Sequence, residues 1–278
     1  MPELPEVETI RRELDREVVG KRIKTVAVTG ARVTRRHSNK KAFITGLEGA
    51  KFTAVDRRGT FLVLKLDTED LLVIDLGENG QLLRSANKDV VDKGTNVVIS
   101  FTQHGQLRFV DPAGTGELFV TSPDTLANDV PELGALGIDP VDQPMSWQNF
   151  GHLLLRHPMK LRAFLLDSSI IVGIGPLYSD EILFAAGLRH DRMSDSLSTQ
   201  EMRRLYRSLV ETLHDAIKYR GTTLDGNDYV DLNGKPGEYQ EHLKVYELEK
   251  QACRRCRAPI VKAKVGGRAT FFCEQCQV

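Results

Sequence analysis

Apolar residues recur every three or four positions at the start of the chain, at Leu4, Val7, Ile10, Leu14 and Val18. This spacing places them on one helix face and predicts an amphipathic first helix in which Pro5 is an early residue. Short strand-like runs follow, separated by turn signals such as Asn79-Gly80, and they predict an antiparallel β-sandwich. The predicted strands are Ile23–Val28, Phe52–Val55, Phe61–Leu66, Leu71–Ile74, Val97–Phe101, Leu107–Val110 and Glu117–Val120.

The pattern becomes helical in the second half of the chain. Residues from about 122 to 144 are rich in Pro and Asp, which predicts an interdomain linker. Ser198 and Glu201 form a capping box, and Gly221 follows as a helix stop. Between them an apolar stripe runs through Met202, Leu205, Leu209, Leu213 and Ile217. The predicted fold class is therefore α+β and multidomain, with an N-terminal antiparallel β-sandwich, a flanking helix and a helical C-terminal part.

Chain length and net charge limit the class of protein only modestly. The chain has 278 residues, enough for two domains with their own cores, and its formal net charge is 0. Proteins that coat DNA nonspecifically are usually basic, so any nucleic-acid site must be a local patch. No signal peptide and no apolar run of transmembrane length are apparent. We expect a cytoplasmic protein with no membrane partner.

The four cysteines stand near the end as Cys253-x-x-Cys256 and Cys273-x-x-Cys276. This spacing predicts one tetrahedral structural zinc ion, and the alternative is a pair of disulfides in an oxidising compartment. Four thiolates leave the metal no open position, so it would fold the module without catalysing. From position 250 onward there are seven basic residues against Glu274, a local charge of +6. Such a cationic module suggests contact with a nucleic-acid backbone, or else only a solvated surface.

The chain opens Met1-Pro2-Glu3-Leu4-Pro5-Glu6. Removal of Met1 would expose the secondary amine of Pro2, and an α-amine has a pKa of about 7.7–8.0. Such an amine attacks a sugar C1′ or an aldehyde and forms an iminium, while Glu3 and Glu6 lie within one helical turn to move protons. The alternative is that many proteins begin Met-Pro and that these acids only favour a helix N-terminus.

Gly173-Ile174-Gly175-Pro176-Leu177-Tyr178 breaks one helix and begins another. A glycine-rich turn at a helix start exposes backbone N–H groups that hold a phosphate, although most such turns are only turns.

Taken together, these motifs resemble the formamidopyrimidine-DNA glycosylase and endonuclease VIII family of base-excision repair enzymes, and the resemblance spans essentially the whole chain. It looks closer to the formamidopyrimidine branch, judging by residues 234–246. The motifs that carry it are Pro-Glu-Leu-Pro-Glu-Val-Glu-Thr at the start, Val55-Asp56-Arg57-Arg58-Gly59, Val172-Gly173-Ile174-Gly175, Leu183-Phe184-Ala185-Ala186-Gly187, Gly221-Thr222-Thr223-Leu224, Gly234-Lys235-Pro236-Gly237 and the zinc hairpin.

The resemblance implies a catalytic β-sandwich at 1–125, a linker at 126–145, a helix–two-turn–helix module at 146–240 and a zinc finger at 241–278, with damaged DNA held between the sandwich and the module. It also implies the roles of individual residues. Pro2 would be the nucleophile, Glu3 its acid/base partner and Glu6 a further acidic residue of the active site. The predicted DNA contacts are Arg268, Gly173, Gly175, Tyr178 and Lys160. We expect a bacterial-type, nucleoid-associated monomer.

Four departures from the family pattern fall on the machinery that grips DNA and extrudes bases. Thr60 stands where the family has a catalytic lysine, and Lys65 is predicted to point to the opposite strand face. Asp75-Leu76-Gly77-Glu78-Asn79-Gly80 replaces His-Leu-Gly-Met-Ser-Gly, and Asp111-Pro112-Ala113-Gly114-Thr115-Gly116 replaces Asp-Pro-Arg-Arg-Phe-Gly. Gly175-Pro176-Leu177-Tyr178 replaces Gly-Asn-Ile-Tyr, which removes an amide side chain and an N–H donor.

Three hypotheses follow. The first is an active glycosylase and β,δ-lyase of shifted range, acting on abasic sites, single strands or bubbles rather than on 8-oxoguanine in duplexes. The second is a catalytically silent binder of damaged or abasic DNA. The third is an amine catalyst or zinc-bearing structural protein that acts on something other than DNA. Retention of Pro2, Glu3 and Glu6 favours the first, because a pure binder needs no N-terminal amine.

Overall fold

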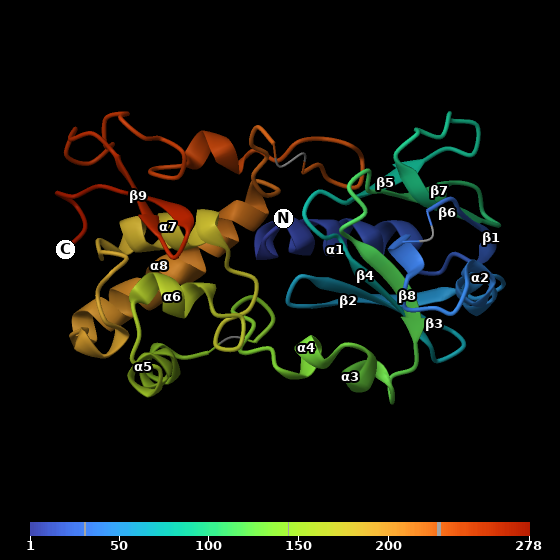
Figure 1. Ribbon diagram of the computed structural model, residues 1–278, viewed down its shortest axis with the longest axis horizontal. Helices are drawn as coiled ribbons and strands as arrows, with labels where there is room; N and C mark the ends of the chain where they lie inside the picture. The colour runs from blue at the N-terminus through green and yellow to red at the C-terminus, as the bar shows by residue number, and fades with distance from the viewer. Residues whose placement is uncertain (31, 144, 227–228) are drawn as a thin grey trace. The chain divides into compact units, whose positions relative to one another are not determined.

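The computed structural model describes residues 1–278 apart from positions 31, 144, 227 and 228 (Figure 1). The chain forms two compact units, each of which draws on two separate segments. The first comprises Met1–Gly134 and Tyr219–Gln240, and the second comprises Ala135–Lys218 and Glu241–Val278. Residues 219–240 thus cluster with the N-terminal segment, whereas the predicted domain division placed them with the helical module. That division stays a prediction.

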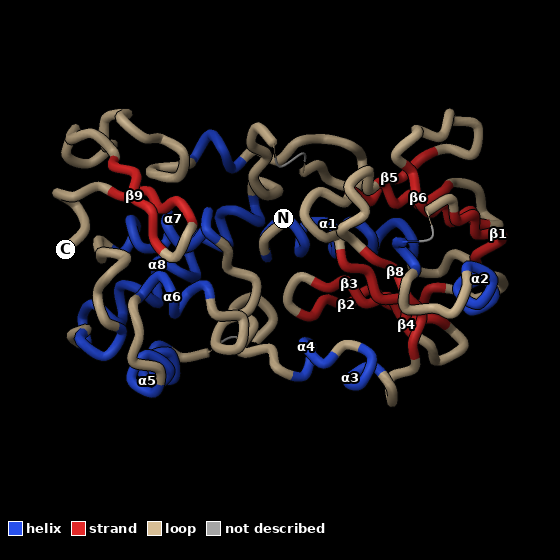
Figure 2. The backbone as a smooth tube through the Cα atoms, viewed as in Figure 1, coloured by secondary structure: helices blue, strands red, loops and turns tan. Residues whose placement is uncertain are grey.

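The first unit contains two four-stranded antiparallel sheets, with strand orders β1-β6-β7-β5 and β2-β3-β4-β8 (Figure 2). Both sheets and helix α1 (Leu4–Val18) contribute to one hydrophobic core, in which Leu14, Phe52 and Phe109 are fully buried. The predicted sandwich with a flanking helix is therefore confirmed. The strands are β1 (Ile23–Val28), β2 (Phe52–Arg58), β3 (Phe61–Leu66), β4 (Leu71–Asp75), β5 (Gln81–Ser85), β6 (Thr95–Phe101), β7 (Gln106–Val110) and β8 (Glu117–Thr121).

Strand β5 and helix α2 (Lys40–Leu47) were not predicted. Only Leu82 of β5 is fully buried and the strand lies at a sheet edge, so it has too few apolar positions for a clear alternation. Helix α2 buries only Phe43 and Leu47 and begins with an Asn39 cap. The predicted linker contains two single-turn helices, α3 (Leu126–Asp129) and α4 (Pro131–Gly134). Position 144, at the end of that stretch, lies outside the described residues.

The second unit is helical with a two-stranded hairpin. Ser198 and Glu201 form the predicted capping box, since the Ser198 N–H donates to Glu201 at 2.8 Å and Glu201 N–H to the Ser198 hydroxyl at 3.3 Å. The elements are α5 (Trp147–Arg156), α6 (Leu161–Leu166), α7 (Pro176–Ala186), α8 (Thr199–Lys218), β9 (Val261–Val265) and β10 (Arg268–Phe272). Single 3-10 turns occur at Arg32–Thr34, Ser194–Ser196 and Tyr239–His242. Across the described part of the chain, no helix is both long and apolar enough to span a membrane.

Candidate active site

The N-terminal residues are held by a reciprocal pair of carboxylates. Glu3 is the N-cap of α1, and its side chain accepts the backbone N–H of Glu6. Glu6 in turn accepts the backbone N–H of Glu3 at 2.9 Å. Pro2, Glu3 and Glu6 are all buried, whereas Met1 is exposed. This pair of reciprocal hydrogen bonds, the Glu3–Glu6 clamp, therefore fixes the peptide that follows Pro2, while the residue before Pro2 stays accessible to solvent.

The second oxygen of Glu6 binds a turn that is distant in sequence. The backbone N–H of Thr222 donates to Glu6 at 2.8 Å. Gly221 has φ +79°, and a Cβ there would lie 2.9 Å from the Glu6 carboxylate. Only glycine permits both this left-handed backbone and so close an approach. Glu6 therefore joins the N-terminus to the turn after α8, and its geometry supports a positioning role.

Tyr229 lies beside this turn and is buried. Burial, together with the charge of Glu6, raises the pKa of the Tyr229 phenol well above its usual value. The hydroxyl therefore stays neutral and donates to the carbonyl of Arg220 at 3.0 Å. Further along the same segment, the N–H of Leu232 donates to Glu13 of α1 at 2.9 Å. The segment 219–240 is thus tied to α1 by two carboxylates of that helix.

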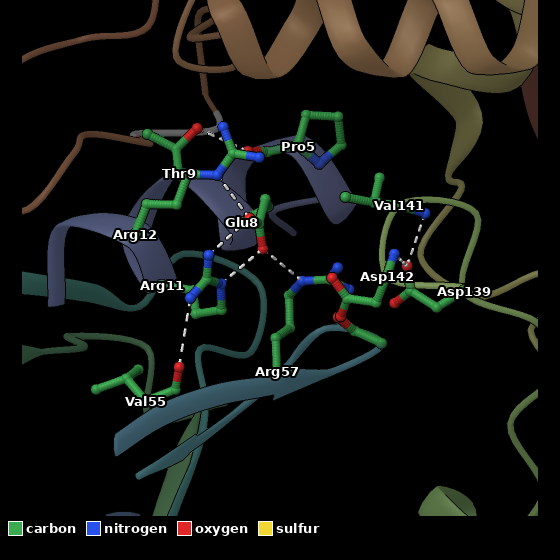
Figure 3. A network of polar contacts seen from close by, with 11 residues as sticks. Pro5, Glu8, Thr9, Arg11, Arg12, Val55, Arg57, Asp139, Val141 and Asp142 are labelled. Atoms are coloured by element: carbon green, nitrogen blue, oxygen red, sulfur yellow. Dashed lines mark hydrogen bonds and ion pairs between the residues drawn. The ribbon is translucent and has the colours of Figure 1, made fainter. Parts of the chain in front are cut away.

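Glu8 forms the centre of a cationic cluster on the other side of α1. Figure 3 shows Arg11, Arg12 and Arg57 directed at its carboxylate, at 2.9, 2.7 and 3.1 Å. Although burial alone would raise the pKa of Glu8, hydrogen bonds from Arg11 and Arg12 and the nearby positive charges lower it to about 2. The Arg57 side chain is completely buried and also donates to the carbonyl of Gly59 at 3.0 Å. Arg57 is therefore an internal structural cation, while Arg58 is exposed.

Thr60 lies in the tight turn that joins β2 to β3. Lys65 does not supply the positive charge of the family's lysine, because it pairs with Asp56 at 2.7 Å on the exposed surface of β3. The prediction that Lys65 points to the strand face opposite Thr60 stays a prediction.

The two departing loops, residues 75–80 and 111–116, are bonded to each other. The N–H of Glu78 donates to the Thr115 hydroxyl at 3.0 Å. A Cβ on Gly77 would lie 2.5 Å from the Gly116 nitrogen, so the two backbones are in close contact. Asp111 accepts the N–H groups of Gly114 and Gly116 at 3.0 and 2.7 Å. The two loops form a compact, hydrogen-bonded pair, and Leu76 of the first loop is buried in the hydrophobic core.

The candidate phosphate turn begins helix α7 as predicted, but it does not break a helix, because α6 already ends at Leu166. Gly175 is the N-cap of α7, which begins directly at Pro176, and Gly173 has φ +76°. Lys160 is exposed and is the N-cap of α6. Tyr178, by contrast, is completely buried in α7. Its side chain fills the core, and the predicted DNA contact at Tyr178 stays a prediction.

The cysteine cluster fits one tetrahedral metal ion. All four sulfurs lie within 4.8 Å of one another, with Cys253 to Cys276 at 3.8 Å and Cys256 to Cys273 at 3.4 Å. A Zn–S bond of about 2.3 Å gives tetrahedral edges of about 3.8 Å, in agreement with these separations. None of the four described cysteines is in a disulfide, so the alternative pairing is excluded here.

The hairpin β9–β10 turns at Gly266-Gly267, which have φ +57° and +80°, and Arg268 is the first residue of β10. Arg268 is exposed. Not every cation of this module faces solvent, because Arg255 donates to the carbonyls of Phe184 and Ala185 at 2.8 and 3.0 Å and so caps the end of α7.

Comparison with known proteins agrees with this arrangement. Residues 1–118 match the formamidopyrimidine-DNA glycosylase N-terminal domain, 136–228 the H2TH domain of the same enzyme and 250–278 the zinc finger found in FPG and IleRS. A formamidopyrimidine-DNA glycosylase of Brevibacillus brevis is 37% identical over 279 residues, covering 100% of this chain and 99% of the relative. The Desulfitobacterium hafniense enzyme is 32% identical, with 100% of both chains covered.

The chain belongs to the formamidopyrimidine-DNA glycosylase family. Among solved structures, the Lactococcus lactis Fpg in complex with abasic-site DNA matches with a TM-score of 0.88 and 28% identity, over 99% of each chain. Its L. lactis counterpart with Fapy-dG DNA has the same TM-score. The fold class, the DNA glycosylase and abasic-site lyase class, a role in base excision repair and a structural zinc ion are accordingly confirmed for this formamidopyrimidine-DNA glycosylase relative.

Sequence reasoning missed two parts of this glycosylase site. The contact of Glu6 with Thr222 spans 216 positions, and that of Arg57 with Glu8 spans 49. Gly221 was identified as a helix stop and as part of a family motif, and its close approach to Glu6 is a further reason for glycine there. Nothing in a single sequence marks Glu8 as the partner of Arg57.

Proposed function

We propose that the mature chain begins at Pro2 and that its amine is the nucleophile of a bifunctional DNA glycosylase and β,δ-lyase. Glu3 moves protons at the sugar, and Glu6 holds the N-terminus and the Gly221-Thr222 turn in place. Arg268, Lys160 and the turn Gly173–Gly175 bind phosphates of damaged DNA. The enzyme acts as a monomer on the DNA of the nucleoid.

The chemistry balances without a redox partner. The lone pair of the Pro2 nitrogen bonds to C1′ while the glycosidic bond breaks, and the base leaves with that electron pair and takes up a proton. The Pro2 nitrogen then loses its N–H proton, its lone pair forms the C1′=N bond of an iminium as the C1′–O4′ bond opens, and O4′ takes up a proton. Loss of a C2′ proton expels the 3′ phosphate, and a second elimination expels the 5′ phosphate. Water finally hydrolyses the conjugate and regenerates the Pro2 amine.

The observation that carries this proposal is the reciprocal Glu3–Glu6 clamp. Each carboxylate accepts the other residue's backbone N–H, directly after Pro2. A capping box alone would stabilise α1, but it would not require the second Glu6 oxygen to bind Thr222 as well. The clamp restricts where the amine of Pro2 can lie, and placing a nucleophile in this way contributes strongly to rate.

Borohydride trapping tests the nucleophile. On an oligonucleotide with one abasic site, the native chain should form a covalent adduct, while Pro2→Gly should form about 10²-fold less because its unrestrained primary amine is misplaced. Mass spectrometry checks that Met1 is absent from both. Pro5→Ala, another N-terminal proline change, should trap normally. If no adduct forms at low salt with Met1 absent, the lyase assignment fails and a silent DNA binder becomes the better description.

We further propose that the enzyme prefers substrates in which the target nucleotide is already unpaired, such as abasic sites in single strands or bubbles. The bonded loops 75–80 and 111–116 support this proposal, because Ala113 and Thr115 offer no large wedge to occupy the gap left by an extruded base. Flipping a base out of a duplex costs a few kcal/mol, and without a wedge side chain no contact in the gap offsets that free energy. Thr60 also removes the cation that the family's lysine would supply at that position of the hairpin turn.

A comparison of single-turnover rates tests this preference. Cleavage at an abasic site in a single strand should exceed base release from a duplex with an oxidised purine by about 10²-fold, since about 1.4 kcal/mol corresponds to a factor of ten. Thr60→Lys should raise duplex base release and leave abasic-site cleavage little changed. Equal rates on the two substrates in the native chain would contradict the preference without affecting the Pro2 assignment.

A further inference from the structure

Arg162 and Asp180 form a buried ion pair in the second unit, with Arg162 Nε 3.1 Å from Asp180 Oδ1. Both side chains are almost completely buried, at 4% and 0% exposed. Burial raises the pKa of Asp180 to about 6, against hydrogen bonds from Thr270 and Phe271 and the charge of Arg162, which lower it. A buried ion pair of this kind often adds little net stability, because removing both charges from water is costly. Its contacts with β10 indicate another role.

The two side chains together form hydrogen bonds with three consecutive residues of β10. The Thr270 hydroxyl and the Phe271 N–H donate to Asp180, each at 2.7 Å. Arg162 donates to the carbonyl of Ala269 at 2.7 Å. Arg268 directly precedes these three residues, at the start of the strand and after the Gly266-Gly267 turn. The ion pair is therefore the anchor of the strand from which Arg268 projects.

Each partner of the pair also belongs to an element that carries another proposed phosphate contact. Arg162 lies in the first turn of α6, two residues after Lys160. Asp180 lies in α7, whose N-cap is Gly175. One buried pair thus links three elements: α6 two residues after Lys160, α7 five residues after its N-cap Gly175, and β10 directly after Arg268.

We propose that the Arg162–Asp180 pair is a positioning device for DNA binding, which fixes Arg268 relative to Lys160 and the Gly173–Gly175 turn so that all three meet the phosphates of one backbone. This inference rests on the proposed phosphate contacts. The charged groups do not touch DNA, since both are buried. They act by setting the spacing between groups that do.

The test measures affinity of the zinc-loaded full chain for a duplex with one abasic-site analogue over a series of salt concentrations. The slope of log affinity against log salt counts neutralised phosphates, at about 0.9 per contact. Asp180→Asn should weaken binding about tenfold and reduce the slope by about one contact or more. Thr270→Val, a nearly isosteric change that removes one β10 bond and keeps the ion pair, should reduce affinity and slope in the same direction by less.

Two controls separate positioning from stability. Glu201→Ala removes the Arg192 ion pair and the α8 cap in the same unit, without a contact to β10, so it should lower the melting temperature and leave the salt slope unchanged. The double variant Asp180→Asn with Arg268→Ala should lose less than the sum of its single changes, because Asp180 acts partly through Arg268.

The outcomes are distinguishable. If Arg268→Ala lowers the slope while Asp180→Asn and Thr270→Val leave it at the native value, the positioning role is wrong and the phosphate contact stands. If Arg268→Ala changes neither affinity nor slope, the proposed phosphate contact itself is wrong and the inference fails with it. A lowered slope in both Asp180→Asn and Thr270→Val, with Glu201→Ala unchanged, supports the inference.

Discussion

Replacement of Cys273 by serine is expected to release zinc and abolish DNA binding through the C-terminal module. Cys273 is completely buried and belongs to a small core with Phe184, Val245, Ile260 and Phe271. A segment this short rarely holds a fold without a metal or disulfides. Structural zinc contributes about 10–16 kcal/mol of apparent binding free energy in zinc-finger peptides at pH 7, so its loss outweighs every other single change considered.

The measurements are zinc content by elemental analysis and DNA affinity at fixed low salt. We expect less than one zinc per chain and loss of the Arg268 contribution to the salt slope, since β10 no longer holds its register with β9. Gln275→Ser is the matched control, because it changes an exposed residue of the same Cys-x-x-Cys knuckle and removes no sulfur. A Cys273→Ser chain that keeps one tightly bound zinc and native DNA affinity would refute the structural role of this ligand.

Much of the fold was accessible from the sequence, for reasons that lie in local pattern. Helix α1 and the strands β1 and β3 match the predicted ranges, because α1 carries apolar residues at helical spacing and both strands are short runs rich in apolar residues. The edge strand β5 was missed because an edge strand with one fully buried residue leaves no such pattern. Equally, the return of residues 219–240 to the N-terminal unit depends on long-range contacts that no local pattern encodes.

The candidate site divides in the same way. The cysteine spacing predicted the metal cluster, and the position of Pro2, Glu3 and Glu6 in one turn predicted their proximity. The side-chain roles were harder to predict, because Tyr178 has a motif position that suggests DNA contact but is completely buried. Arg57 stands beside a hairpin turn in the sequence, yet its side chain is an internal partner of Glu8. Burial and partner identity are tertiary properties, so they required the structure.

Replacement of Glu8 by glutamine should destabilise the first unit strongly. Glu8 is the anion for the completely buried side chain of Arg57 and also pairs with Arg11 and Arg12 (Figure 3). Removing one partner of a buried ion pair is strongly destabilising, at a cost of about 3–5 kcal/mol. The free energy of unfolding, measured by urea denaturation at pH 7, should fall by that amount. Glu17→Gln on the same helix is the control, because its partially exposed pairs should contribute about 1 kcal/mol or less.

The lowered pKa of Glu8 predicts how the difference in unfolding free energy between the native chain and Glu8→Gln changes with pH. The pKa of Glu8 is lowered from 4.5 to about 2 in the folded chain, so the unfolded chain binds more protons between these values. The stabilisation is therefore complete above about pH 4.5 and is lost progressively as the pH falls toward 2. The gap in unfolding free energy between the native chain and Glu8→Gln should narrow over that window, while the gap for Glu17→Gln stays small throughout. A gap that is equal at pH 7 and pH 3 would mean that Glu8 contributes packing and not charge, because protonation removes the charge with which Glu8 pairs with Arg57.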